Sequence, residues 1–298
     1  MKFISYEWNG TQTYGVYDEN TKLVWDLRML GEKAGILLPD TLAEAIAKTA
    51  DLYGQANKWL AAAGENEKAL AAADEQEIRW LAPIPRPAKN VMCIGKNYRD
   101  HAIEMGGEES IPEHMLVFTK SPTAVIGCEE DIPAHADLTD ALDYEGELAV
   151  VIGKRGKEIS RGEAFDYIFG YTIINDVTAR DIQKRHKQFF LGKSLDGTCP
   201  MGPWIVPKEE IATPHQLAIE TKVNGEIRQR SNTEHLIFPI DEMIAVLSKG
   251  MTLEPGDIIA TGTPSGVGYG MNPPRMLKPG DTVEITIKKI GTLANKVR

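Results

Sequence analysis

The sequence of 298 residues predicts a mainly β protein of the α+β class, with a small α+β domain ahead of a sandwich or barrel. Apolar residues make up 42% and charged residues 26%, a globular balance that excludes wholesale disorder. The first 80 residues contain an Ala-rich helical stretch, whereas short β-rich runs follow residue 91. A Pro-rich segment separates the two. We therefore predict a domain over residues 1–80, a linker over 81–90 and a second domain over 91–298.

The N-terminal part begins with alternating strands over residues 1–28, with turns at Asn9-Gly10 and Asp18–Asn20. Residues 40–80 have helical periodicity. The residues at that spacing include Leu42, Ala45, Ile46, Leu52, Leu60 and Leu70. The alternating prolines of residues 82–87 fix φ and remove backbone donors, so we expect an extended connector there.

The second part contains eight predicted strands separated by Gly, Pro and Asp. They span residues 91–95, 116–119, 148–153, 171–175, 204–206, 217–223, 257–261 and 282–287. Asn224-Gly225 predicts a hairpin turn, because a type I′ turn needs positive φ at both central residues. We expect three short helices: one capped by Ser160 and Glu163, one after Thr178, and one over 241–249 that stops at Gly250.

The charge balance of 33 basic and 43 acidic side chains gives a net charge of −10. This disfavours a nucleic-acid partner, since phosphate binding needs clustered Lys and Arg. Three widely spaced cysteines form no disulfide framework, and no apolar run is long enough to cross a membrane. We therefore expect a cytoplasmic protein with no membrane partner.

Three carboxylates form a candidate metal site. Glu145 and Glu147 share one face if the strand begins before Leu148, and Asp176 ends the next apolar run. Two close carboxylates repel each other unless a cation lies between them, and oxygen ligands suit Mg²⁺ or Mn²⁺. The alternative is that both glutamates form the wet face of an edge strand.

His101 and Glu104 stand at i and i+3 on a predicted helix, so their side chains are neighbours. A carboxylate beside an imidazole fixes its tautomer and raises its basicity, as a general base requires. The alternative is a surface pair on a short helix.

Two further segments contain glycines. Gly192-Lys193-Ser194 ends like a phosphate loop, but Lys187 replaces the glycine that this motif requires. Lys193 is then either a solvated charge or a cation that meets a carboxylate substrate. The turn over residues 260–268 either cradles an anion through its N–H groups or only reverses the chain. We expect the remaining histidines to be structural or exposed: His114, His135, His186, His215 and His235.

The ordered motifs together closely resemble the fumarylacetoacetate hydrolase family. The segments concerned are Ile94–Tyr98 with His101 and Glu104, Glu145-Gly146-Glu147, Asp176–Asp181, Gly192–Ser194 and Thr261–Pro264. The resemblance covers roughly residues 88–298. It implies a β-sandwich roll and a homodimer, with residues 1–80 as the variable N-terminal domain of many bacterial members.

The resemblance also implies roles for individual residues. Glu145, Glu147 and Asp176 match the ligands of one Mg²⁺ or Mn²⁺ ion. His101 and Glu104 match a dyad on a lid that activates water, and Lys193 matches a lysine near the metal. The expected substrate contacts are Tyr98, Arg99, Gln183, Gly262 and Thr263.

This resemblance implies a hydrolase that cleaves a C–C bond in acylpyruvate- or fumarylpyruvate-type 2-oxo acids through a metal-bound pyruvate enolate. The strings over 95–106 and 183–190 resemble a Bacillus-type subgroup with oxaloacetate decarboxylase activity, which is the alternative. Isomerisation of an unsaturated diacid, or a metal- or ligand-binding module without catalysis, are further readings. The physiological substrate, the metal used in the cell and the role of the N-terminal domain stay open.

Overall fold

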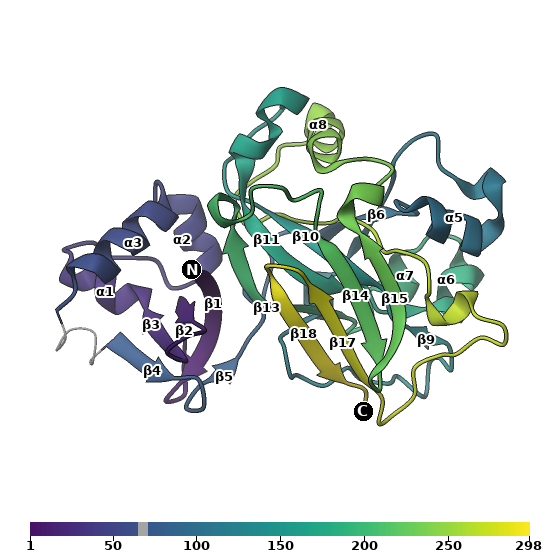
Figure 1. Ribbon diagram of the computed structural model, residues 1–298, viewed down its shortest axis with the longest axis horizontal. Coiled ribbons are helices and arrows are strands. Elements are labelled where there is room, and N and C mark those ends of the chain that lie inside the picture. The colour runs from purple at the N-terminus through teal and green to yellow at the C-terminus, as the bar shows by residue number, and fades with distance from the viewer. Residues whose placement is uncertain (65–70) are drawn as a thin grey trace.

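A long twisted sheet runs through the molecule in the computed structural model, which describes residues 1–64 and 71–298 (Figure 1). Among these residues the sheet has twelve strands, and its main path is β4-β3-β2-β1-β13-β11-β10-β16-β6-β7. The strands of the chain are β1 (Lys2–Trp8), β2 (Thr11–Asp18), β3 (Leu23–Asp26), β4 (Ala72–Asp74), β5 (Arg79–Trp80), β6 (Val91–Gly95), β7 (Leu116–Lys120), β8 (Val125–Ile126), β9 (Leu142–Asp143), β10 (Gly146–Ile152), β11 (Ile168–Asn175), β12 (Thr178–Ala179), β13 (Cys199–Pro207), β14 (Ala218–Val223), β15 (Glu226–Asn232), β16 (Ile258–Ala260), β17 (Thr282–Ile287) and β18 (Gly291–Lys296).

Strand β10 lies at the centre of this sheet, paired antiparallel with β11 on one side and β16 on the other. Leu148 and Val150 point into one hydrophobic core, while Ala149 and Val151 point into a second core on the opposite face. A strand that is buried on both faces needs a continuous apolar run rather than alternation. This is why the sequence after Glu147 is uniformly apolar.

The second sheet, β15-β14-β17-β18, packs on the first through β14 against β10, β17 against β11, and β18 against β13. Ile219 and Ile285 join Leu148 and Val150 in the core between the two sheets. The Asn224-Gly225 turn connects β14 and β15 with positive φ at both residues, as predicted. The α+β sandwich is therefore confirmed.

The N-terminal strands extend the main sheet, because β1 pairs with β13 at Phe3 and Ile205. Three helices accompany these strands on one side of the molecule (Figure 1): α1 (Leu27–Lys33), α2 (Leu42–Lys48) and α3 (Leu52–Ala62). The strands predicted for residues 1–28 and helices within 40–62 are confirmed. The helical prediction for 72–80 is wrong, because pairing with β3 and β1 makes β4 and β5 there. Leu70 lies outside the described residues.

The predicted linker contains no helix or strand over residues 81–90. Its Ala82 and Ile84 are nevertheless buried in the same core as Phe3. The connector therefore packs as part of the molecule, and the domain limits themselves stay a prediction.

The remaining helices are α5 (Arg99–Gly106), α6 (Arg180–His186), α7 (Phe190–Lys193) and α8 (Ile240–Gly250). The helices predicted after Thr178 and near 241–249 are confirmed, although Gly250 is the last helical residue rather than the stop. The capping box at Ser160 is wrong. Its hydroxyl bonds the Glu163 carboxylate at 2.6 Å instead of a backbone N–H, and the segment is a 3₁₀ helix over Arg161–Tyr167.

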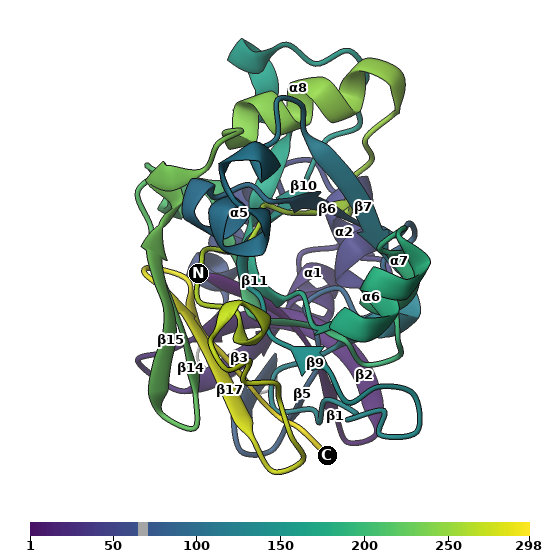
Figure 2. The same cartoon turned by 90° about the vertical axis from the view of Figure 1, so that its right-hand side faces the viewer.

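Helices α5, α6 and α7 gather on the side of the molecule that is remote from α1, α2 and α3, and they face the viewer in Figure 2. Within the described part of the chain, no helix has the length and apolar character needed to span a membrane.

Candidate active site

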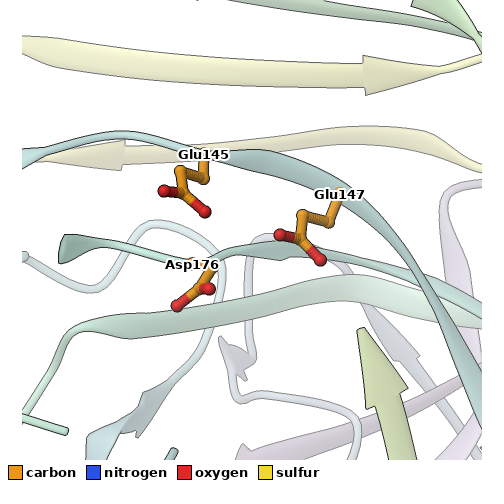
Figure 3. A group of neighbouring side chains, drawn as sticks. All are labelled: Glu145, Glu147 and Asp176. Atoms are coloured by element: carbon orange, nitrogen blue, oxygen red, sulfur yellow. The ribbon is translucent and has the colours of Figure 1, made fainter. Parts of the chain in front are cut away.

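The three predicted metal ligands converge in the structure. Glu145 directly precedes β10, Glu147 is its second residue, and Asp176 directly follows β11. The antiparallel register pairs Gly146 with Asn175, so the end of β11 lies beside the start of β10. One carboxylate oxygen from each residue lies within 4.8 Å of the others, and all three side chains are buried (Figure 3).

The alternative of a wet edge strand is wrong, because β10 has a partner on both sides and Glu147 is only 2% exposed. Gly146 is required between the two glutamates. A Cβ there would lie 2.3 Å from Thr221 Oγ1 of the second sheet. Close packing of the two sheets therefore fixes the Glu-Gly-Glu segment.

Three basic side chains contact two of these carboxylates. Lys193 Nζ lies 2.9 Å from Glu145 Oε2 and 2.7 Å from Asp176 Oδ2. Lys120 Nζ lies 2.8 Å from Asp176 Oδ1, and Arg180 Nη1 lies 2.8 Å from Glu145 Oε1. Lys193 is thus not a solvated charge, and any contact that it makes with a substrate is shared with its contacts to Glu145 and Asp176.

Glu147 differs from the other two carboxylates of the cluster. No cationic group lies within 4 Å of its carboxylate among residues 1–64 and 71–298, and one oxygen accepts from Gly262 N at 2.7 Å. Burial, followed by the charges of Asp176 and Glu145, raises its pKa well above the usual range. Burial also acts to raise the pKa of Glu145, but Lys193 and Arg180 outweigh it and lower that pKa to about 2.

This asymmetry fits a divalent cation. A buried carboxylate that faces two others without a positive partner is stabilised when a cation lies among them. Oxygen-only ligands favour Mg²⁺ or Mn²⁺ over Zn²⁺ or Cu²⁺. Glu145, Glu147 and Asp176 are therefore suited to hold one such ion.

The predicted dyad forms on α5. His101 Nδ1 lies 3.2 Å from Glu104 Oε2, and the other Glu104 oxygen accepts from Gly266 N at 2.9 Å. His101 is 5% exposed, so the alternative of a surface pair is wrong. In a neutral imidazole, an Nδ1–H that donates to the Glu104 carboxylate leaves the lone pair on Nε2, where a base needs it.

The backbone N–H groups of the glycine-rich segment over residues 261–270 donate to carboxylates of the protein itself rather than to a free anion site. Its N–H groups reach three carboxylates: Gly262 N donates to Glu147 and Gly266 N donates to Glu104. Gly268 N and Tyr269 N donate to the third, Asp143, at 2.8 and 3.0 Å. The segment thus holds Glu147 of β10, Glu104 of the dyad and Asp143 in one arrangement.

Asp143 and Arg180 are site residues that the sequence analysis did not assign. Asp143 is fully buried and accepts from Arg180 Nε at 2.9 Å and from the two loop N–H groups. Arg180 in turn contacts Glu145 and donates to Gln183 Oε1 at 3.3 Å. Their sequence signal was their position beside the motif carboxylates: Asp143 two residues before Glu145 and Arg180 four after Asp176.

Lys120 was also missed. It ends β7, far in sequence from every predicted ligand, and no motif marks it. A lysine that closes a strand is ordinarily read as a surface charge. Here it is 0% exposed and donates to Val177 O at 2.9 Å as well as contacting Asp176.

A cavity of about 330 Å³ opens beside these groups. Of the predicted site residues, His101, Glu145, Glu147, Gln183, Lys193 and Thr263 line it. Arg180 lines it too, and its Nη2 is buried without a hydrogen-bond partner among the described residues. The cavity therefore offers a donor for an anion.

The structure does not bring every predicted substrate contact to this cavity. Arg99 is exposed and pairs with Glu108 at 3.1 Å, so it points away from the site. Tyr98 is buried but does not line the cavity, and the backbone N–H of Gly262 donates to Glu147 rather than toward the cavity. The hydroxyl of Thr263 donates to Gly146 O and accepts from Gln229. Both bonds are internal to the protein, so they use the hydroxyl that was expected to hold the substrate carboxylate.

Comparison with known proteins gives consistent matches. The family model described as fumarylacetoacetate (FAA) hydrolase C-terminal matches residues 90–298. Oxaloacetate tautomerase YisK of Bacillus subtilis is 52% identical over 301 residues, covering 100% of both chains.

Two solved structures extend the similarity. A fumarylacetoacetate hydrolase from Exiguobacterium antarcticum is 40% identical with a TM-score of 0.84, over 100% of this chain and 99% of the other. A maleylpyruvate hydrolase from Sphingobium sp. SYK-6, in complex with manganese(II) and pyruvate, is 28% identical with a TM-score of 0.78, over 100% and 98%. Sequence, fold and site thus agree, and the chain belongs to the fumarylacetoacetate hydrolase family.

Proposed function

We propose that this protein is a divalent-metal-dependent enzyme that moves a proton at C3 of an oxaloacetate-type 2-oxo acid, interconverting its keto and enol forms. The observation that carries the proposal is the buried Glu145–Glu147–Asp176 cluster with His101 lining the same cavity. The end-to-end similarity to an oxaloacetate tautomerase supports this reaction over the hydrolysis that the motifs alone favoured.

The protein's own groups suit such a proton transfer. A divalent ion held by the three carboxylates would supply a Lewis acid that polarises the 2-keto oxygen. His101, oriented by Glu104, removes a proton from C3 through Nε2, and the electron pair of that C–H bond passes to the 2-keto oxygen, which takes a proton from water to give the enol. The same steps in reverse regenerate the keto acid. Arg180 and Lys193 stabilise the negative charge that develops on the substrate oxygen.

Hydrolysis of an acylpyruvate is the second candidate. The same His101 can deprotonate a water instead of C3, and the similarity to a maleylpyruvate hydrolase supports this use. Loss of carbon dioxide from oxaloacetate, the alternative inferred from the sequence, needs no nucleophile at all. These three reactions share the ligand set and differ in what leaves the substrate.

The experiment is a panel with the Mn²⁺- or Mg²⁺-supplied protein. Decay of the enol form of oxaloacetate without pyruvate or carbon dioxide supports tautomerisation, and equal yields of pyruvate and carbon dioxide support decarboxylation. Pyruvate released without carbon dioxide, together with acetate from acetylpyruvate or fumarate from fumarylpyruvate, supports hydrolysis. His101→Ala should lower the proton-transfer rate by at least 100-fold, while His235→Ala, at an exposed position, should not. An unchanged rate in His101→Ala would remove His101 as the base.

We also propose that the protein is a homodimer. Apolar side chains of the adjoining β7 and α7 are unusually exposed, namely Leu116, Val117, Phe190 and Leu191. An apolar patch of this kind favours contact with a second copy. Light scattering on the purified protein should give twice the chain mass of 32.9 kDa, and Leu191→Glu should shift it toward the monomer.

A further inference from the structure

Three lysines that line the active-site cavity have no acidic partner among residues 1–64 and 71–298. Lys96, Lys184 and Lys187 belong to the same lining as His101. In the described part of the chain none of the three has a carboxylate within 4 Å, whereas the other cavity lysine, Lys193, contacts two. We call these three residues the lysine rim.

The backbone holds two of these lysines in unusual conformations. Lys96 has φ of 53°, and Lys187 has φ of 61° with ψ of −43°. Gln188 N donates to His186 O at 2.6 Å, which makes a γ-turn centred on Lys187. Positive φ is costly for residues other than glycine, and such conformations concentrate at functional sites.

The segment after Lys96 is also anchored. Asn97 is fully buried, and its side-chain amide donates to Phe238 O at 3.1 Å and Thr261 O at 2.8 Å. Its oxygen accepts from Phe238 N at 2.8 Å. These bonds fix the backbone at the point where Lys96 enters the cavity.

The buried charges of the site leave no excess negative charge to neutralise the lysine rim once a divalent ion is bound. Four buried carboxylates, those of Asp143, Glu145, Glu147 and Asp176, oppose the three cations Lys120, Arg180 and Lys193. A divalent ion would turn this near balance into a small positive excess, matched by the carboxylate of a 2-oxo acid. The lysine rim adds up to three positive charges that neither the protein nor that carboxylate neutralises.

We propose that the lysine rim binds the second carboxylate of a dicarboxylic 2-oxo acid and holds it against loss as carbon dioxide. This inference rests on the proposed function, since it names what distinguishes the substrates of the same cavity. Apolar side chains such as Ile94, Met105 and Phe118 line the cavity as well and suit the carbon chain between the two charged ends.

The second part of the proposal follows from charge movement. When carbon dioxide leaves, the C3–C4 bond breaks, its electron pair passes to C3, and the C4 carboxylate loses its negative charge. Cations near C4 stabilise the charged ground state more than this transition state, so they slow decarboxylation. Proton transfer at C3 leaves the C4 carboxylate charged throughout, so the same cations do not oppose it.

The test compares the native protein with Lys184→Gln/Lys187→Gln and with Lys96→Gln, all loaded with Mn²⁺. Oxaloacetate is paired with its 4-methyl ester, which keeps the 2-oxo acid but lacks charge at C4. We expect the double variant to raise the KM for oxaloacetate about tenfold, to leave the KM for the ester unchanged and to increase carbon dioxide release relative to tautomerisation. Lys249→Gln, on the exposed end of α8, is the matched control.

A second readout does not depend on turnover. Malate and lactate share a 2-hydroxy acid head and differ by one carboxylate, so calorimetry on the Mn²⁺ protein measures the contribution of the second charge. The native protein should prefer malate, and the double variant should lose that preference. If the variants keep the preference for malate and for the diacid, the lysine rim has no such role. If oxaloacetate is not turned over but the malate preference disappears in the variants, the lysine rim binds the second carboxylate and the proposed tautomerase activity is wrong.

Discussion

Gly270 provides a direct test of the dyad, because it controls the space around Glu104. A Cβ at Gly270 would lie 2.4 Å from Glu104 Cγ and Cδ and 2.5 Å from Oε1. Carbon atoms in contact need about 3.5–4.0 Å, so Gly270→Ala must displace the Glu104 carboxylate by about 1 Å. Gly270 does not have positive φ, so the substitution acts by crowding rather than by backbone strain.

The displacement has a calculable consequence. Moving the carboxylate by about 1 Å lengthens its contacts with His101 Nδ1 and Gly266 N, now 3.2 and 2.9 Å, beyond hydrogen-bond range. A misplacement of this size costs about 100-fold in rate where proton transfer needs the oriented base. The nearest atoms to that Cβ all belong to Glu104 and none to the candidate metal ligands, so Mn²⁺ affinity should stay the same.

The assay is kcat for the enol–keto conversion of oxaloacetate, with Mn²⁺ affinity measured by calorimetry in parallel. Gly162→Ala is the control, because a Cβ there meets nothing within 4 Å. A folded Gly270→Ala protein with kcat within twofold of the native value would refute the reasoning, since Glu104 would then not orient the base.

Three further predictions concern stability and metal binding. Asp143→Asn removes one of the two buried carboxylate partners of Arg180 and should lower the free energy of unfolding by about 3 kcal/mol in urea titrations; an unchanged midpoint contradicts it. The raised pKa of Glu147 means that Mn²⁺ competes with a proton for this carboxylate, so the rise in Tm with Mn²⁺ should be larger at pH 8 than at pH 6 and absent in Glu147→Gln; an equal rise at both pH values counts against this. Burial lowers the pKa of His215, and the neutral Nε2 of this residue accepts a hydrogen bond from Ile240 N. The contribution of His215 to the free energy of unfolding is therefore complete above pH 6.5 and is lost as pH falls through its folded-state pKa. His215→Ala should reduce the dependence of the unfolding free energy on pH between pH 7.5 and 5.5. A slope equal to that of the native protein would show that His215 does not cause this dependence.

Local patterns predicted much of the fold because they depend on neighbouring residues. Strands β6 and β17 occur with the predicted bounds, since each apolar or alternating run is flanked by turn residues. Residues 72–80 show the limit. Their helical spacing yielded to sheet pairing with β1 and β3, which is a contact over long sequence distance.

The site was predictable to the extent that its residues lie within motifs. Glu145, Glu147 and Asp176 come from two adjoining strands, so residue spacing together with family resemblance identified them. Lys120 lies 56 residues before Asp176, and no local pattern links them. The role of the glycine segment was also open, because its N–H groups could not be assigned to the protein's own carboxylates without the fold.

The sequence by itself therefore indicated the family and the sandwich, and through the family resemblance it singled out Glu145, Glu147 and Asp176 as candidate ligands and His101 with Glu104 as a candidate dyad. Tertiary structure alone decided which charges are compensated. Within the described residues, Glu145 and Asp176 have cationic partners, Glu147 has no cationic partner, and the lysine rim has no acidic partner. The physical reason is that compensation depends on distances of a few ångströms between segments far apart in the chain. Residue types fix which charges exist, but folding fixes which of them remain for a metal ion and a substrate.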